Sequence, residues 1–421
     1  MPRVFPSGIS RLLIGVRFAA VGFVCLSHSR RSMRDCTEVK ATMYAMKRSS
    51  MMWVLVATMI GGAAGRAAAQ DPQPTPQEAA AKQDAATMGF FRNTEFGGLV
   101  DGYYDYYSTK HNGLYRNFDV NHNTFTGNMA ELWLAKTPAA DSRLGYKVKF
   151  NFGPAASNIL AFAEPNNPLV NIQEAYGSYL APAGKGLQID FGKFVTPVGA
   201  EVIEAKDNWN YSRSLLFALA EPYYHAGIRL TYAANDKVSL MGGVVNGWNN
   251  ATQDNNSGKT GMFGITYKPN AAFSIVENYL VGPEQNGTND NVRNFSDTVA
   301  TYTVNPTTSV MASYDWGKEG STQWQGIAAY LKYQANKWVA VVPRYEYFND
   351  GDAFSTGTAQ HLQEFTFTFE VKGTDNFIWR AEYRGDYSNH TVFTNSAGTA
   401  GTEKNQHSIS FGFLYSFSTK S

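Results

Sequence analysis

Charged and aromatic side chains gather in one stretch of the chain, between residues 195 and 222. They are Glu201, Glu204, Lys206, Asp207, Trp209, Tyr211 and Arg213. Carboxylates and cations lining a passage select ions and polar solutes, and aromatic rings offer flat faces on which sugars could stack. The chemistry that this stretch predicts is therefore the binding or filtering of solutes, and not bond breaking.

A second set of charged residues is spread over the whole chain, at alternating positions within short segments. Both signs occur, as expected for residues that line one common surface. The members of this candidate lining are Asp101, Asp105, Glu131, Lys147, Lys149, Asp190, Arg229, Arg344, Glu346, Arg380, Glu382 and Arg384.

The elements that must position these residues are about sixteen stretches of alternating polarity between 94 and 417. In the last one, Ile409, Phe411 and Phe413 share one face, whereas Ser408 and Ser410 share the other. A strand that crosses a bilayer in a barrel wall needs roughly 9–11 residues, apolar outside and polar inside. A soluble β-sandwich also alternates, but its faces would rarely be so aromatic and so charged.

The connections between these stretches switch between short and long along the chain. Short ones such as 234–236 and 269–271 are Gly/Pro/Asn/Asp turns, whereas 108–127 and 195–222 are long. An even number of strands places both chain ends on one side, so alternate loops face the exterior. The sequence thus predicts an all-β fold: a transmembrane antiparallel up-and-down β-barrel over residues 94–421, with short periplasmic turns and long extracellular loops.

Two of these stretches leave the faces open. In the first strand, Asp101 and Asp105 share a face with the aromatic Tyr103 and Tyr107. In 273–281 both faces carry apolar residues.

The N-terminal part divides into three predicted segments before the barrel. Residues 46–69 have the charged, apolar and small-residue regions of a signal peptide, with cleavage near Ala69, and a membrane anchor is the alternative. Residues 1–45 are interpreted as an extension from a start codon set too early, or as a functional extension. Residues 70–93 are rich in Pro, Gln and Ala and predict a flexible periplasmic lead-in.

Export of the chain changes its charge and its cysteine content. Residues 1–69 hold ten of the 36 basic and two of the 35 acidic residues, which leaves a net charge of about −7. A nucleic-acid partner is not expected for such a chain, because it would require a basic face. Both cysteines, Cys25 and Cys36, lie in the removed part, so the mature chain can form no disulfide.

A barrel of about sixteen strands is too wide for its wall side chains to fill, and leaves an aqueous channel unless a segment plugs it. The third long loop, 195–222, is the candidate for this constriction. Its apolar run at 215–219 is expected to fold back inside the barrel, and contact with lipid or a partner at the rim is the alternative. Mixed charges in the lining predict at most a mild preference for cations, since strong selectivity needs charges of one sign.

Three short motifs carry a resemblance to a known family. They are 192–201 (GKFVTPVGAE), 211–214 (YSRS) and 222–227 (PYYHAG), with 173–176 (QEAY) upstream. With these motifs the chain resembles the OmpL-like β-barrel porin family of bacterial outer membranes. The resemblance implies a porin in the bacterial cell outer membrane, with no assigned substrate and no catalytic residues.

The predicted function is passive diffusion of small hydrophilic solutes through a channel in outer-membrane lipid, by a chain that could form a homotrimer. A substrate-specific channel and a non-conducting adhesion or structural barrel are the alternatives. No enzyme is predicted, because no serine can be placed near the base candidate His225. No cofactor or metal is predicted either, since His111 and His122 lack the spacing of metal ligands.

Overall fold

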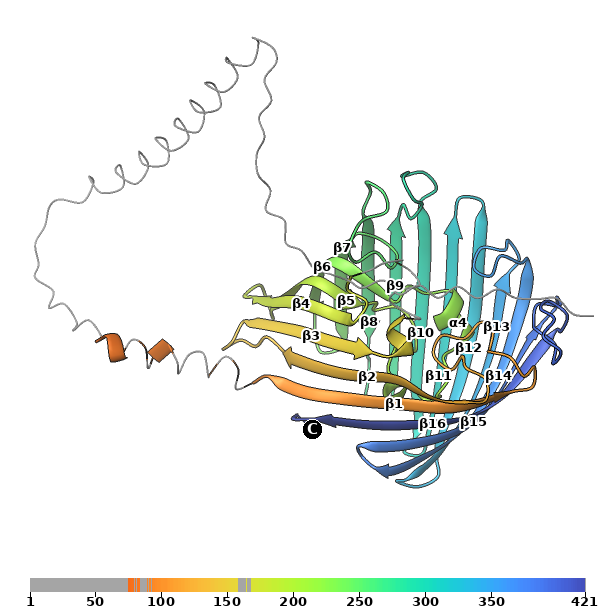
Figure 1. Cartoon of the computed structure of the whole chain (residues 1–421). Helices are drawn as coiled ribbons and strands as arrows, with labels where there is room; N and C mark the ends of the chain where they lie inside the picture. The colour runs from red at the N-terminus through yellow and green to blue at the C-terminus, as the bar shows by residue number, and fades with distance from the viewer. Residues whose placement is uncertain are drawn as a thin grey trace, which may run out of the picture. The chain divides into compact units, whose positions relative to one another are not determined.

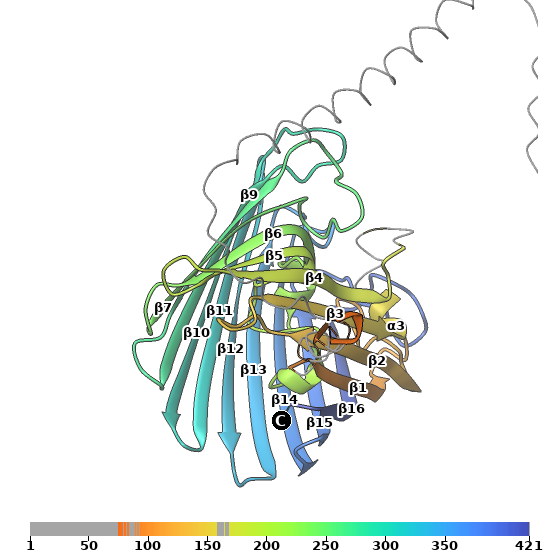
Figure 2. The same ribbon diagram turned by 90° about the vertical axis from the view of Figure 1, so that its left-hand side faces the viewer.

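The computed structural model describes residues 75–78, 80, 82, 83, 89, 91, 93–157, 164 and 168–420. The predicted extension 1–45 and signal peptide 46–69 lie outside these residues, as do parts of the predicted lead-in. Within the compact unit 76–421, sixteen strands form one closed barrel in which β1 pairs with β16 (Figures 1 and 2). The predicted fold class and strand number are therefore confirmed.

Every strand pairs antiparallel with its neighbours in the sequence, and no strand crosses over another. β2 begins at Thr124, inside the stretch 108–127 that was predicted as a long loop, and β11 and β12 are joined by only two residues. The strands are β1 (Glu95–Tyr107), β2 (Thr124–Lys136), β3 (Leu144–Phe152), β4 (Ile172–Ala181), β5 (Leu187–Val195), β6 (Tyr224–Ala233), β7 (Val238–Val245), β8 (Thr260–Tyr267), β9 (Phe273–Gly282), β10 (Arg293–Asn305), β11 (Thr308–Glu319), β12 (Thr322–Gln334), β13 (Val339–Asp350), β14 (Gln360–Thr374), β15 (Phe377–Ser388) and β16 (Asn405–Ser418).

The alternation of side chains assigns one face of each strand to the exterior and the other to the lumen. On β16, Phe411 is 55% exposed, whereas Ser410 is 1% exposed. On β14, which pairs with β13 and β15, Phe365 and Phe367 point outward, whereas Glu364 points inward. Apolar rings thus face the surroundings of the barrel, as the sequence predicts.

Of the two strands whose faces the sequence leaves open, β1 is settled by what it contacts. Tyr103 and Tyr107 of β1 point into the lumen with Asp101 and Asp105, because loop 1 (108–123) folds inward over them. The hydroxyl of Tyr103 accepts hydrogen bonds of 3.1 Å from the backbone N–H groups of Val120 and Asn121. An aromatic side chain with a polar tip suits such a position, where its ring is buried and its hydroxyl is bonded.

The interior of the barrel holds an apolar cluster as well as charges. The helix α4 (Leu215–Leu219) lies inside the wall (Figure 1), and its Leu215 and Leu216 pack in one buried cluster with Trp324 and Phe348. Ser214 begins the helix by accepting a hydrogen bond of 3.0 Å from the N–H of Phe217. The short helices α3 (Pro154–Ala156) and η2 (Ala205–Asp207) lie in the connections. Among the described residues, no helix is long and apolar enough to cross a membrane.

Candidate functional site

The connection between β5 and β6, residues 196–223, is called loop 3 and reaches several parts of the barrel wall. Near its start, the side-chain amide of Asn278 on β9 donates to the carbonyl of Pro197 (3.1 Å), and Asp297 on β10 accepts from the N–H of Gly199 (3.1 Å). Farther along, Glu204 accepts a 2.8 Å hydrogen bond from Gln173 on β4. The loop therefore contacts wall strands on opposite sides of its path.

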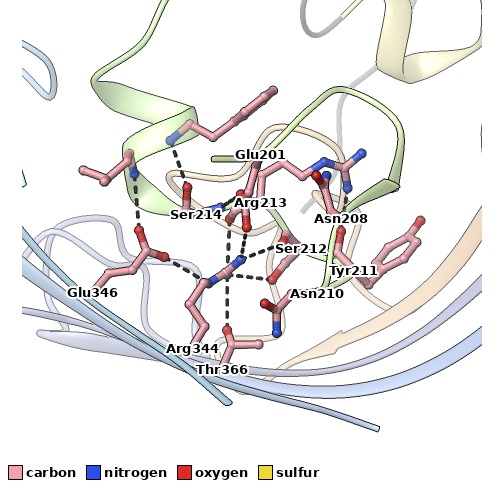
Figure 3. Close-up of polar contacts among 12 residues, drawn as sticks. Glu201, Asn208, Asn210, Tyr211, Ser212, Arg213, Ser214, Arg344, Glu346 and Thr366 are labelled. Carbon is pink, nitrogen blue, oxygen red and sulfur yellow. Dashed lines mark hydrogen bonds and ion pairs between the residues drawn. The ribbon is translucent and has the colours of Figure 1, made fainter. Parts of the chain in front are cut away.

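Arg344 on β13 is the centre of the largest polar network between loop 3 and the wall (Figure 3). Its Nη1 donates to Oε1 of Glu201 and to the carbonyl of Ser212, both at 2.8 Å. Its Nε lies 2.9 Å from Glu364 and 3.1 Å from Glu346. All four side chains are buried, so the guanidinium is balanced by carboxylates where water is excluded.

Three wall residues form hydrogen bonds with backbone N–H and C=O groups of loop 3. These groups lie outside any strand or long helix, so they have no partners from regular secondary structure. Arg380 on β15 donates to the carbonyls of Ala205 (2.6 Å) and Asn210 (2.9 Å). Glu382, also on β15, accepts from the N–H of Tyr211 at 2.8 Å. Arg384 donates to the carbonyl of Arg213. Because buried backbone groups need partners, the alternating charges of β15 hold an irregular segment inside the barrel.

Tyr211 lies flat against the wall because the residue beneath it has no side chain. A Cβ at Gly412 on β16 would lie 2.3 Å from Cδ2 of the Tyr211 ring. The Tyr211 hydroxyl donates a 2.8 Å hydrogen bond to Oδ1 of Asp101. Gly412 is thus needed for the close approach of the ring to the strand.

Glu204 forms the contact of loop 3 with the opposite wall. It forms an ion pair with Lys149 of β3, whose Nζ also lies 3.6 Å from Glu131 of β2. Burial by itself would raise the pKa of Glu204, but the ammonium of Lys149 outweighs it and lowers the pKa to about 2. Glu204 is therefore ionised at neutral pH.

The other predicted constriction residues take different positions. Arg213 donates at 3.1 Å to the carbonyl of Val202, and its guanidinium lies 4.3 Å from the Phe118 ring centre. Lys206 and Asp207 pair with each other at 2.7 Å, and Asp207 is exposed. Trp209 is half-buried and meets Tyr330 edge to face.

The remaining predicted lining residues point inward, mostly in ion pairs. Arg229 pairs with Asp190 at 2.9 Å, and Lys147 pairs with Glu174 at 2.5 Å. Asp105 is buried in the lumen beside loop 1. The predicted residues therefore do not form one ring. They divide among the contacts of β13–β15 with loop 3, the wall at β2–β6, and β1 beside loop 1.

Two cavities remain between loop 3 and strands β2–β5. One, of about 240 Å³, lies against the 201–207 segment and reaches Thr196 and Tyr223. The other, of about 350 Å³, reaches Trp133 and Thr137 at the periplasmic end of β2. Both are lined by Lys147, Lys149 and Asp207, so they adjoin each other along this wall.

A group of carboxyls near the end of loop 3 was not predicted from the sequence. Glu221 lies beside Asp297 on β10 and Asp315 on β11, and all three are buried. Burial and the charge of Asp297 raise the pKa of Glu221 well above its usual range. Asp297 and Asp315 were not predicted either, although the alternation along their strands could have placed them on the lumen face; no sequence signal places Glu221 next to them.

Loop 1 contributes a second residue that was not predicted. Arg116 donates to Oδ2 of Asp386 on β15 at 3.1 Å and to the hydroxyl of Ser408 on β16 at 3.0 Å. Loop 1 therefore enters the same side of the lumen as the network around Arg344.

Comparisons with known proteins agree on the type of barrel. Residues 93–417 match the model of a family described as "Putative beta-barrel porin-2, OmpL-like". No curated protein matches the chain.

Among solved structures, the outer-membrane channel DcaP of Acinetobacter baumannii is 13% identical, with a TM-score of 0.52, over 77% of this chain and 97% of that one. An anion-selective porin from Comamonas acidovorans is 11% identical, with a TM-score of 0.51, over 77% of this chain and 99% of that one. OmpT of Vibrio cholerae in its trimer form is 13% identical, with a TM-score of 0.50, over 77% of this chain and 99% of that one. At such identities the likeness shows a shared fold.

Proposed function

The chain belongs to the OmpL-like β-barrel porin family, and on this premise we propose that it lets small hydrophilic solutes diffuse passively across the outer membrane through a water-filled channel narrowed by loop 3. An outer-membrane porin needs a polar lumen and an apolar outer wall, and this barrel has both. The observation that carries the proposal is the position of loop 3, which is bonded to β13–β15 on one side and to β3–β4 on the other. Solutes would then pass beside the loop and not along the barrel axis.

The passage that we propose runs between the 201–207 segment of loop 3 and strands β2–β5. The two adjoining cavities on this wall support this route, because together they extend from Thr196 and Tyr223 to Thr137. The Lys149–Glu204 ion pair crosses this route and joins loop 3 to strand β3. Lys147, Lys206 and Asp207 add further charges of both signs, so the route would discriminate weakly between ions, with a mild preference for cations at most.

Export and assembly follow from the same proposal. We propose that the chain is exported by the signal peptide 46–69 and cleaved near Ala69, so that the mature protein has no cysteine. A homotrimer is the proposed assembly, and its support is the shared fold with the trimer form of Vibrio cholerae OmpT. Lipid would cover the exposed apolar wall outside the subunit contacts.

The test is the conductance and reversal potential of the refolded mature chain in a planar bilayer under a salt gradient. Open steps are expected for the wild type. In Lys149→Met the reversal potential should shift toward the value of a more cation-selective channel, because Glu204 and Glu131 lose their counter-charge. In Glu204→Gln it should shift in the opposite direction. A channel that never conducts would overturn the proposed function.

The control is Lys332→Met on β12, a half-buried lysine whose Nζ lies 3.7 Å from Glu370. Lys332 does not line either cavity of the proposed passage. No shift of the reversal potential is expected for this variant. A shift equal to that of Lys149→Met would place the flow on the other side of loop 3.

A solute-specific channel is the second candidate, and the narrowness of the passage favours it. Its wall carries the aromatic residues Trp133 and Tyr176 beside Ser178 and Gln188, a mixture suited to sugars or other polar solutes. Block of the conductance by one class among sugars, amino acids and phosphate would support this candidate. Equal passage of all three classes would support general diffusion.

A further inference from the structure

The outer face of β9 and β10 carries a carboxylate where an apolar side chain is expected. Glu277 lies midway along β9, and its neighbour Asn278 points into the lumen, where it donates to Asp297. Glu277 therefore points outward. Oε1 of Glu277 accepts a 2.7 Å hydrogen bond from the hydroxyl of Ser296, and Oε2 accepts from Thr298, both on β10.

The surroundings of Glu277 confirm which face it occupies. Ile265 is its register partner on β8 and is 45% exposed, and Tyr314, opposite Thr298 on β11, is 42% exposed. Both lie in the apolar outer wall of a barrel that spans the outer membrane. A carboxylate facing hydrocarbon is unfavourable, and two hydroxyl donors use only part of its capacity to accept hydrogen bonds.

Next to this carboxylate, three small side chains lie side by side in the outer wall. Ala300 on β10 pairs with Ala312 on β11, which pairs with Ala329 on β12. All three alanines point outward, and Ala312 and Ala329 are exposed. On β14 and β16, outward positions hold Phe367 and Phe411, which would keep a neighbouring wall at a distance.

We propose that a second copy of this chain docks on the β9–β12 outer patch. The patch consists of Glu277, Ser296, Thr298, Ala300, Ala312 and Ala329. The proposal rests on the homotrimer proposed above and names the surface through which it forms. A protein neighbour removes lipid from the carboxylate and brings polar groups to it, which acyl chains cannot do.

Small side chains support the same occupant. Barrel walls approach closely only where side chains are short, and close packing in lipid is the main source of association between membrane-spanning elements. The patch spans four neighbouring strands, which lie about 4.8 Å apart. Because the copies are identical, the same carboxylate would be removed from lipid in each of them.

The experiment compares Ala312→Trp with the control Ala381→Trp. Ala381 also points outward, on β15, where it pairs with Phe369 and Phe411 on the aromatic side of the barrel. The mass of the refolded mature protein is measured by native mass spectrometry and by light scattering in detergent. Ala312→Trp is expected to lower the trimer fraction roughly tenfold, and Ala381→Trp to leave it unchanged.

Folding of each variant is checked by the heat-dependent shift in gel mobility, so that a misfolded barrel is not counted as a dissociated one. Glu277→Leu is the second variant. If a copy covers Glu277, the leucine should weaken the trimer while the barrel stays folded. If lipid covers it, the leucine should leave the mass unchanged and increase resistance to unfolding, which would overturn the proposal.

Three further results would overturn it: a wild-type monomer, a persistent trimer in Ala312→Trp, or dissociation in Ala381→Trp instead. Conductance separates this proposal from the proposed function. A trimer that dissociates as expected but never conducts supports the contact surface and contradicts the channel. A conducting chain whose trimer is unaffected by Ala312→Trp supports the channel and contradicts the contact surface.

Discussion

Arg344 on β13 donates a 2.8 Å hydrogen bond to Glu201 of loop 3, so a residue of the wall and one of the loop form a single buried ion pair. The same guanidinium contacts Glu346 and Glu364. Three carboxylates around one cation leave excess negative charge unless Arg384, whose Nε lies 3.8 Å from Glu364, also contributes. The loop is thus held by a network in which the loss of Arg344 would leave buried carboxylates without their counter-charge.

Arg344→Met is expected to release loop 3 from the wall. Removing one partner of a buried ion pair typically costs about 3–5 kcal/mol, because the remaining carboxylates stay buried without a counter-charge. Urea unfolding in lipid vesicles would measure the loss in the free energy of unfolding. The control is Lys185→Met, which removes the pair with Asp236 in an exposed turn and should have no measurable effect.

The strand pattern was readable from the sequence because each strand has a period of two. Phe411 and Ser410 fall on opposite faces whatever the exact boundaries are. The inward position of Tyr103 was not readable, since it depends on the folding of loop 1 over β1. The partners of Glu201 and Glu204 were also not readable, because Arg344 and Lys149 lie far from them in the sequence and only the closed barrel brings them to the loop.

Gly412→Val should displace Tyr211 from the wall. A Cβ at this position overlaps the tyrosine ring, and overpacking of this kind typically costs about 1–3 kcal/mol. Tryptic cleavage after Lys206 is expected to become faster than in the wild type, and thermal unfolding should begin at a lower temperature. Gly177→Val on β4 is the control, because a Cβ there would meet nothing within 4 Å. Equal cleavage of both variants would contradict the tight contact.

Acid should weaken the contact between loop 3 and β3 through Glu204. Its pKa is lowered from 4.5 to about 2, so the folded state favours the ionised form. The stabilisation is complete above pH 4.5 and is lost as the pH falls from 4.5 to 2, with a slope of about 1.4 kcal/mol per pH unit. Unfolding measured across this range should be less dependent on pH in Glu204→Gln. An identical slope in the variant would mean that this carboxylate is not the group responsible.

Glu221→Gln should have the opposite dependence on pH. The raised pKa of Glu221 means that the folded state holds a proton that the unfolded chain releases above about pH 4.5. The wild type therefore loses stability as the pH rises from 4.5 toward the raised pKa, and the glutamine variant avoids this loss. The free energy of unfolding should favour the variant increasingly as the pH rises above 4.5 toward the raised pKa, and a constant difference would contradict this assignment.

Phe413→Lys tests the assignment of faces on which the whole barrel depends. Phe413 points outward on β16, packs 4.9 Å from the ring of Trp379 and is 37% exposed. A lysine in contact with the hydrocarbon should cost about 2–4 kcal/mol near the bilayer midplane. Met241→Lys on β7 is the matched change on the lumen face, where the half-exposed methionine lines a cavity beside Arg229 and Asn278. Its lysine can reach water and the nearby polar groups, so urea unfolding in vesicles should be close to that of the wild type. Equal losses in the two variants would mean that β7 or β16 presents the wrong face to the membrane.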